Sequence, residues 1–175
     1  MKVQYRGPYL ILQVNENDLE HYDYWLKTGG AFNLNMEEFF EIVIQNPKLE
    51  LSPEYAEIVN KAIKYKHNGN VTVILDKLAS KLNKEQLEAV IYHEIGHSAM
   101  KHSQRFGSLE CAEKEIEADT YAVQFTSKKA MREAINISCC DTVQRYAHKA
   151  RFVNSLYEIV FKDETYCARM KALED

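Results

Sequence analysis

The sequence predicts an α+β fold that is mostly helical and contains a small sheet. Several stretches place apolar residues at three-and-four spacing, which is typical of helices that pack against a core. Short runs of β-branched and aromatic residues indicate a few strands, of which residues 71–75 are the clearest. The chain has 175 residues, 46% of them hydrophobic, and no Pro/Gly/Ser-rich linker. A single domain over residues 1–175 is therefore expected.

The N-terminal half is expected to alternate strands and helices. Residues 3–5 and 9–14 are rich in strand-forming side chains and are separated by Gly7-Pro8. Three helices are then bounded by local signals: a Gly29-Gly30 stop, an Asn35/Glu38 capping box and a Ser52-Pro53 start. The expected helices cover residues 18–27, 35–44 and 52–66.

The chain from residue 83 onward is expected to be mostly helical. Asn83 and Gln86 have the spacing of a capping box, and the helix that they open is expected to run through His102. Further helices are expected over residues 111–125, from residue 128, and from an N-cap at Asp141 followed by Gln144. The remainder is also expected to be helical.

Composition excludes several classes of protein. The net charge is −4, which gives no general attraction to nucleic acid or to an anionic membrane. No apolar run approaches the ~20 residues that span a bilayer, and no export signal is recognised at the N-terminus. The four cysteines lack metal or redox spacing and are expected to be reduced and mostly buried. These observations predict a cytoplasmic protein without a nucleic-acid or membrane partner.

A metal-binding motif occupies the helix that begins near residue 83. Residues 93–97 are His-Glu-Ile-Gly-His, an HExxH motif. At 3.6 residues per turn, His93 and His97 lie one turn apart on one face, so both imidazoles can reach one ion. Imidazole nitrogen is a preferred zinc ligand, whereas Glu94 is better placed to accept a proton from an attacking water. The motif predicts two zinc ligands and a general base.

The third ligand is expected on the following helix. Glu115 and Asp119 are four residues apart and share one helical face. Small residues flank that face and would allow close approach to the motif helix: Ala112, Ala118 and Ala122. We expect Glu115 to bind the metal and Asp119 to accept the second N–H of a ligating histidine. Glu113 and Glu117 are expected to project to other sides.

Residues 71–102, together with EIEADTYA from residue 115, resemble the gluzincin zinc peptidases of the HtpX and CAAX prenyl protease type. That family combines a strand, a capped HExxH helix with a further His near its end, and a Glu-x-x-x-Asp helix. The resemblance implies a soluble, minimal zincin-like metallopeptidase domain with an HExxH active-site helix. It implies zinc bound by His93, His97 and Glu115, with Glu94 as the base and Asp119 behind the ligands. A second resemblance is to the ImmA/IrrE-type peptidases.

The residue that stabilises the oxyanion is less clearly marked. The family often has His-Pro followed by an Arg in a terminal helix. Here Arg169 fits, but Asp163 and Glu164 stand where His-Pro would be. The two candidates are Arg169 and His148, the latter on the helix expected after Asp141.

One other zinc-peptidase class is excluded, and one histidine is left over. Metzincins need a third His six residues after the second motif His, with a Gly between, but these positions are Ser103 and Met100. His102 is one residue short of that position. We expect His102 to be a helix-end residue that supports the dipole or bonds locally.

The expected activity is zinc-dependent hydrolysis of peptide bonds in a protein or peptide substrate. Residues 71–75 are expected to lie beside the cleft and to pair with an extended substrate along a free edge. Two alternatives remain open. One is a regulator-type protease that cleaves a single partner protein, as the ImmA/IrrE resemblance suggests. The other is a catalytically silent, zinc-stabilised binding protein, against which the intact Glu94 counts.

Overall fold

The structure is a computed structural model, and it describes residues 2–15, 30–34, 53, 56, 57, 60, 71–102, 111–149 and 164–174. Side chains are described for these residues except 32, 34, 111 and 139–149. The chain divides into two compact units, Met1–Lys81 and Leu82–Asp175. The single domain expected from the sequence stays a prediction. The helices expected over residues 18–27 and 35–44 lie outside the described residues, as does most of the one over 52–66.

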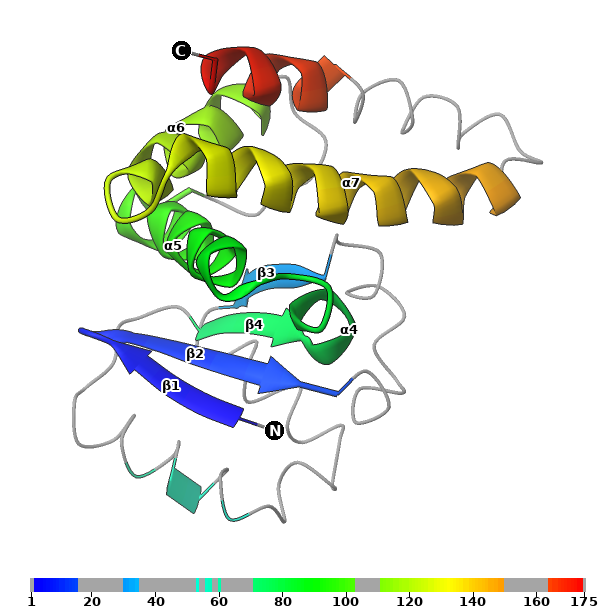
Figure 1. The fold of residues 1–175 in the computed structure, drawn as a ribbon. Coiled ribbons are helices and arrows are strands. Elements are labelled where there is room, and N and C mark those ends of the chain that lie inside the picture. The colour runs from blue at the N-terminus through cyan, green and yellow to red at the C-terminus, as the bar shows by residue number, and fades with distance from the viewer. Residues whose placement is uncertain are drawn as a thin grey trace. The chain divides into compact units, whose positions relative to one another are not determined.

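The first unit is built on a four-stranded sheet (Figure 1). The two expected strands, β1 (Lys2–Arg6) and β2 (Tyr9–Val14), pair as an antiparallel hairpin, which turns at Gly7 with a φ of 57°. Strand β4 (Val71–Leu75) pairs in parallel with β2 and antiparallel with β3 (Ala31–Leu34), so the order is β1-β2-β4-β3. The sequence analysis did not predict β3.

Strand β4 is central in this sheet. All five of its residues are buried, which is typical of a strand covered on both faces. Both of its edges are paired, and Thr72 also donates a hydrogen bond of 2.8 Å to Oδ1 of the buried Asn33 on β3. The expectation that residues 71–75 offer a free edge to a substrate is therefore wrong. A run that is apolar at four of its five positions, as this one is, indicates a central strand rather than an edge.

A short helix, α4 (Asp76–Ala79), follows β4 and was not expected from the sequence. Its Asp76 accepts a hydrogen bond from the side chain of Gln13 on β2, and its buried Leu78 packs closely on Gly30. Gly30 has a φ of +98°, and a Cβ there would lie 2.8 Å from the Cβ of Leu78. This position therefore requires glycine for two separate reasons.

The second unit is helical among its described residues. Helix α5 (Lys84–Ala99) begins with the predicted capping box, in which the backbone N–H of Gln86 donates to Asn83 and that of Asn83 donates to Gln86. Helix α5 ends at Ala99 rather than at His102, because Lys101 adopts a left-handed φ of 57°. Helix α6 (Cys111–Val123) follows, and a C-terminal helix covers residues 164–172.

Helix α7 (Lys128–Lys149) is continuous over 22 residues. The sequence analysis expected a second helix to begin at Asp141, but that residue lies inside α7. No Gly or Pro interrupts residues 128–149, so the backbone has no reason to break at a residue that only resembles an N-cap.

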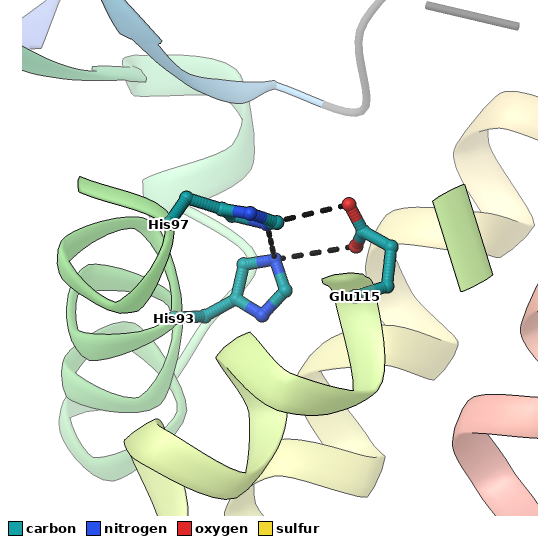
Figure 2. A group of neighbouring side chains, drawn as sticks. All are labelled: His93, His97 and Glu115. Carbon is teal, nitrogen blue, oxygen red and sulfur yellow. Dashed lines mark hydrogen bonds and ion pairs between the residues drawn. The ribbon is translucent and has the colours of Figure 1, made fainter. Parts of the chain in front are cut away.

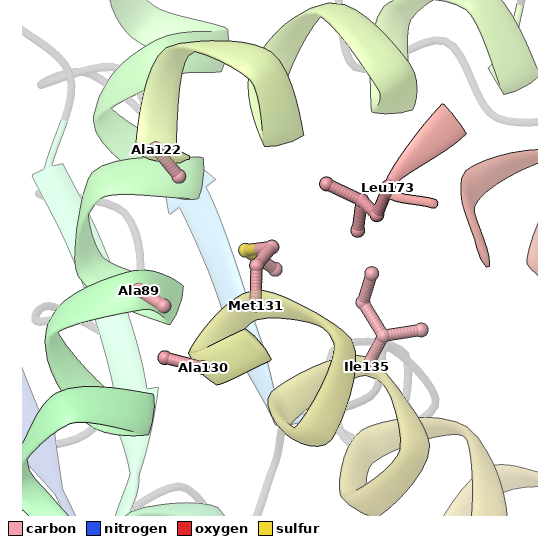
Figure 3. Close-up of a cluster of buried hydrophobic side chains, with 6 residues drawn as sticks. All are labelled: Ala89, Ala122, Ala130, Met131, Ile135 and Leu173. Atoms are coloured by element: carbon pink, nitrogen blue, oxygen red, sulfur yellow. The ribbon is translucent and has the colours of Figure 1, made fainter. Parts of the chain in front are cut away.

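The core of the second unit joins all four of these helices. Figure 3 shows Ala89 of α5, Ala122 of α6 and Met131 of α7 facing one another, with Leu173 reaching in from the end of the C-terminal helix. Leu173 is only 4% exposed. The C-terminal helix is therefore anchored on the core, which fixes the position of the polar side chains that it carries.

The described residues bear on two expectations, the absence of a membrane-spanning helix and the state of the cysteines. None of the helices in the described part of the chain is long and apolar enough to cross a membrane. Cys167 is a free thiol as expected, but it is exposed rather than buried. It lies on the side of the C-terminal helix that does not pack on the core.

Candidate metal centre

Three side chains from two helices meet in the second unit. His93 and His97 project from one face of α5 toward Glu115 of α6 (Figure 2). The Nε2 atoms of the two imidazoles are 3.1 Å apart. Each of them lies 3.3 Å from one carboxylate oxygen of Glu115. The two helices thus bring together the three side chains that the sequence analysis predicted as ligands.

The spacing of these atoms fits a metal ion. Zinc bound tetrahedrally at 2.0–2.1 Å has neighbouring ligand atoms about 3.3 Å apart. The three separations in the cluster are 3.1, 3.3 and 3.3 Å. Two ring nitrogens this close repel through their lone pairs unless a cation or a proton lies between them. Two imidazoles and a carboxylate are also one of the donor sets that zinc takes in catalytic sites.

Small residues where α5 contacts α6 allow the three side chains of the cluster to come together. Gly96 lies on α5 between the motif histidines, and a Cβ there would lie 3.2 Å from both the Cα and the carbonyl oxygen of Ala118 on α6. Ala118 and Ala122 are fully buried. Because no side chain separates the two backbones at this point, α6 comes close enough for Glu115 to reach the imidazoles.

Asp119 lies one turn after Glu115 and contacts the other side of the first imidazole. Its Oδ1 is 2.7 Å from Nδ1 of His93, a close polar pair although the N–H is not aligned as in a regular hydrogen bond. Asp119 is only 1% exposed. Nδ1 of His93 therefore faces a carboxylate, which favours a proton on this nitrogen and leaves Nε2 directed at the cluster.

Arg169 of the C-terminal helix joins both carboxylates. Its Nε and Nη2 donate to the two oxygens of Asp119 at 2.8 and 2.7 Å, and its Nη1 lies 2.8 Å from Oε2 of Glu115. The contact with Asp119 is bidentate, the geometry that suits a guanidinium best. Arg169, which the sequence analysis considered as an oxyanion donor, is thus placed against the acidic side chains of the centre.

The charges around the two carboxylates keep them ionised. Burial alone would raise the pKa of Glu115, but Arg169 and the contacts with His93 and His97 hold this pKa well below its usual value. Burial also opposes ionisation of Asp119, and the charges of Arg169 and His93 lower its pKa nonetheless. An ionised Glu115 is the form that binds a cation.

The pKa values of His93 and Glu94 are raised rather than lowered, which favours the protonated form of both side chains. Burial lowers the pKa of His93, but the charge of Asp119 and contacts with Asp119 and Glu115 outweigh it and raise the pKa to about 10. Burial raises the pKa of Glu94, against the charges of His93 and His97, which lower it. The carboxyl of Glu94 thus lies within the field of the cluster, and its raised pKa suits a group that takes up a proton.

A second pair of residues at the cluster was not predicted. Nδ1 of His102 lies 3.0 Å from Nδ1 of His97, and Nε2 of His102 lies 2.9 Å from Oε2 of Glu117. The local bonding expected for His102 is present. Glu117 was expected only to project away from the face of Glu115 and Asp119. Its carboxylate in fact contacts the ring of His102. The sequence did offer one signal for this contact, which is a further histidine at position 102, five residues after His97.

The remaining candidate is His148. It lies one residue before the end of α7, and its side chain is outside the described residues. Its proposed role at the oxyanion stays a prediction.

Comparison with known proteins supports a metallopeptidase. A model of peptidase family M48 matches residues 62–112. The chain is similar to that family over β4, α5 and the start of α6. The match includes His93, Glu94 and His97, and it stops three residues before Glu115. It suggests a metal-dependent peptidase, which acts on proteins or peptides. No curated protein and no solved structure matches the chain.

Proposed function

We propose that this protein is a zinc-dependent endopeptidase. The observation that carries the proposal is the convergence of His93, His97 and Glu115, at separations that suit zinc, beside the buried carboxyl of Glu94. The similarity to peptidase family M48 over residues 62–112 supports hydrolysis of peptide bonds as the reaction.

Each side chain of the centre has a role in this mechanism. His93, His97 and Glu115 hold the metal, which supplies Lewis-acid polarisation of the scissile carbonyl when it is bound. Glu94 takes a proton from the attacking water and later gives it to the leaving amine. Its raised pKa supports the first transfer, because a carboxylate that is harder to ionise accepts a proton more readily.

The contacts of Arg169 support a role different from the oxyanion donor considered from the sequence. All three of its guanidinium nitrogens lie at 2.7 to 2.8 Å from oxygens of Glu115 and Asp119. A donor to an oxyanion would have to be aimed at the substrate. We therefore assign Arg169 to holding the ligand carboxylate and its neighbour in place.

The decisive experiment compares the wild type with Glu94→Gln. The variant should bind one zinc per chain, because Gln removes the base without removing a ligand, and should lose most peptide hydrolysis. Glu88→Gln, on the same helix, is the matched control and should keep both properties. Hydrolysis by Glu94→Gln at the wild-type rate would disprove the mechanism.

The breadth of substrates can be measured with the same pair of proteins. Labelling of newly formed peptide N-termini in a cell extract, with wild type against Glu94→Gln, reports every cleaved bond. Many cleaved proteins, together with cleavage of casein, would indicate a broad endopeptidase. Cleavage of a single protein would indicate the regulator-type protease.

A further inference from the structure

The end of helix α5 has a specific backbone geometry. The N–H of His102 donates to the carbonyl of His97 at 3.0 Å, and the N–H of Lys101 donates to that of Ser98 at 3.2 Å. Lys101 has a φ of 57°. These two bonds and the left-handed residue define a Schellman motif. In this motif the residue after the left-handed one returns beside the last turn of the helix, which here places His102 next to His97.

The side chains of His97 and His102 are in contact at this position. A Schellman motif often carries an apolar contact between these two positions, whereas here the two rings approach through their Nδ1 atoms at 3.0 Å. The side chain of His102 is 9% exposed, and its other nitrogen lies 2.9 Å from the carboxylate of Glu117, which is 60% exposed. His102 is thus enclosed between a ligand candidate and an acidic group.

The N–H groups in this chain of contacts can be assigned by elimination. Nε2 of His97 faces His93 and Glu115, so it must keep its lone pair to bind a metal. The single N–H of a neutral His97 is then on Nδ1, and it donates to Nδ1 of His102. His102 in turn carries its N–H on Nε2, from which it donates to Glu117. Every donor has an acceptor in this arrangement.

We propose that His102 and Glu117 are positioning residues that hold His97 in its metal-binding tautomer and orientation. This inference rests on the metal site of the proposed function. It gives the two imidazoles parallel supports: His93 is backed by Asp119 and Arg169, and His97 is backed by His102 and Glu117. Such supports raise the basicity of a ligating histidine and keep its ring in place.

The alternative is that His102 serves only to end the helix. Its backbone N–H makes the capping bond whatever its side chain is, so substitutions of the side chain separate the two roles. His102→Phe keeps a flat ring but has no acceptor for His97. His102→Asn can place an amide oxygen near the position of Nδ1 and restore the acceptor.

The test is zinc affinity, measured by competition with a chromophoric chelator in the full-length, metal-free protein. We expect His102→Phe to bind zinc roughly 10- to 100-fold more weakly, the usual effect of losing such a support. His102→Asn should recover most of this loss. Because Glu117 is exposed, Glu117→Ala tests the same chain of contacts without disturbing packing, and it should also weaken zinc binding. Glu113→Ala, on the same helix, should have no effect.

A second measurement reports the tautomer directly. In the zinc-loaded wild type, long-range ¹H–¹⁵N correlations should show the His97 proton on Nδ1. Cobalt-substituted His102→Phe should show a changed visible spectrum, whereas Glu113→Ala should match the wild type. Wild-type zinc affinity in both His102→Phe and Glu117→Ala would overturn the inference.

These readouts separate the inference from the proposed activity. A protein that binds zinc, depends on His102 for affinity and cleaves no peptide would disprove the peptidase and keep the positioning role. A wild type that binds no zinc would overturn both.

Discussion

Nη1 of Arg169 lies 2.8 Å from Oε2 of Glu115, so the proposed third ligand is paired with a positively charged side chain. The same guanidinium binds Asp119 through its other two nitrogens. The side chain of Arg169 is only 14% exposed. Removing it would leave two acidic groups close together in a poorly solvated site, where an unpaired charge is costly.

Substitution of Arg169 should therefore act on the metal site. Arg169→Met should weaken zinc binding by at least about tenfold, because Glu115 and Asp119 lose the group that orients them. Lys171→Met, on the exposed side of the same helix, is the control. Zinc titration and kcat distinguish the two roles considered for Arg169. A variant with wild-type zinc affinity and a greatly reduced kcat would instead identify Arg169 as the oxyanion donor.

Asp119→Ala should weaken zinc binding by roughly 10- to 100-fold. The substitution removes the acceptor beside Nδ1 of His93 and leaves Arg169 without its bidentate partner. Breaking a buried pair of this kind should also lower the free energy of unfolding of the metal-free protein by about 3–5 kcal/mol. Urea denaturation measures the second effect, with Glu113→Ala as the control. An unchanged zinc dissociation constant would place Asp119 outside the metal site.

Gly96→Ala tests the contact between α5 and α6. The added methyl group would lie 3.2 Å from backbone atoms of Ala118, so the helices must separate. Overpacking costs about 1–3 kcal/mol and better helix propensity returns up to about 1 kcal/mol, so a net loss of up to about 2 kcal/mol is expected. Zinc affinity should fall as Glu115 moves away. Ala99→Gly costs stability through propensity alone and should leave zinc affinity unchanged. Equal zinc affinity in Gly96→Ala and the wild type would show that close approach is not required.

Metal removal should lower thermal stability. Zinc that binds only the folded protein adds about 2.7 kcal/mol when its free concentration is 100 times the dissociation constant. A chelator should therefore lower the Tm of the wild type, and added zinc should restore it. Glu115→Ala, which lacks a proposed ligand, should respond much less to either treatment. A Tm that responds equally in both proteins would argue against Glu115 as a ligand.

Local signals in the sequence predicted local structure well. The capping box at Asn83 and Gln86 is present, and the i, i+4 pair on α6 does face the motif histidines. These features depend on helical periodicity and on hydrogen bonds between residues three or four positions apart, both of which can be read from a sequence. The assignment of the three metal ligands stays a prediction until an ion is measured.

Long-range pairing was harder to predict. Strand β4 is central because β3 pairs with it, and nothing in the short segment Ala31–Leu34 indicates that partner. The role of Glu117 depends on a left-handed turn at Lys101, a conformation that lysine seldom adopts. Arg169 was found through a family resemblance, since its partners lie on another helix.

The distance along the chain between Asp119 and Arg169 has a consequence for biosynthesis. The two residues are 50 positions apart along the chain. A ribosome makes both motif histidines, Glu94 and Glu115 well before it makes the arginine that orients Glu115. The nascent chain therefore carries the side chains of the candidate metal centre without their final arrangement. Assembly of the centre is deferred until the growing chain has extended at least 50 residues past Asp119.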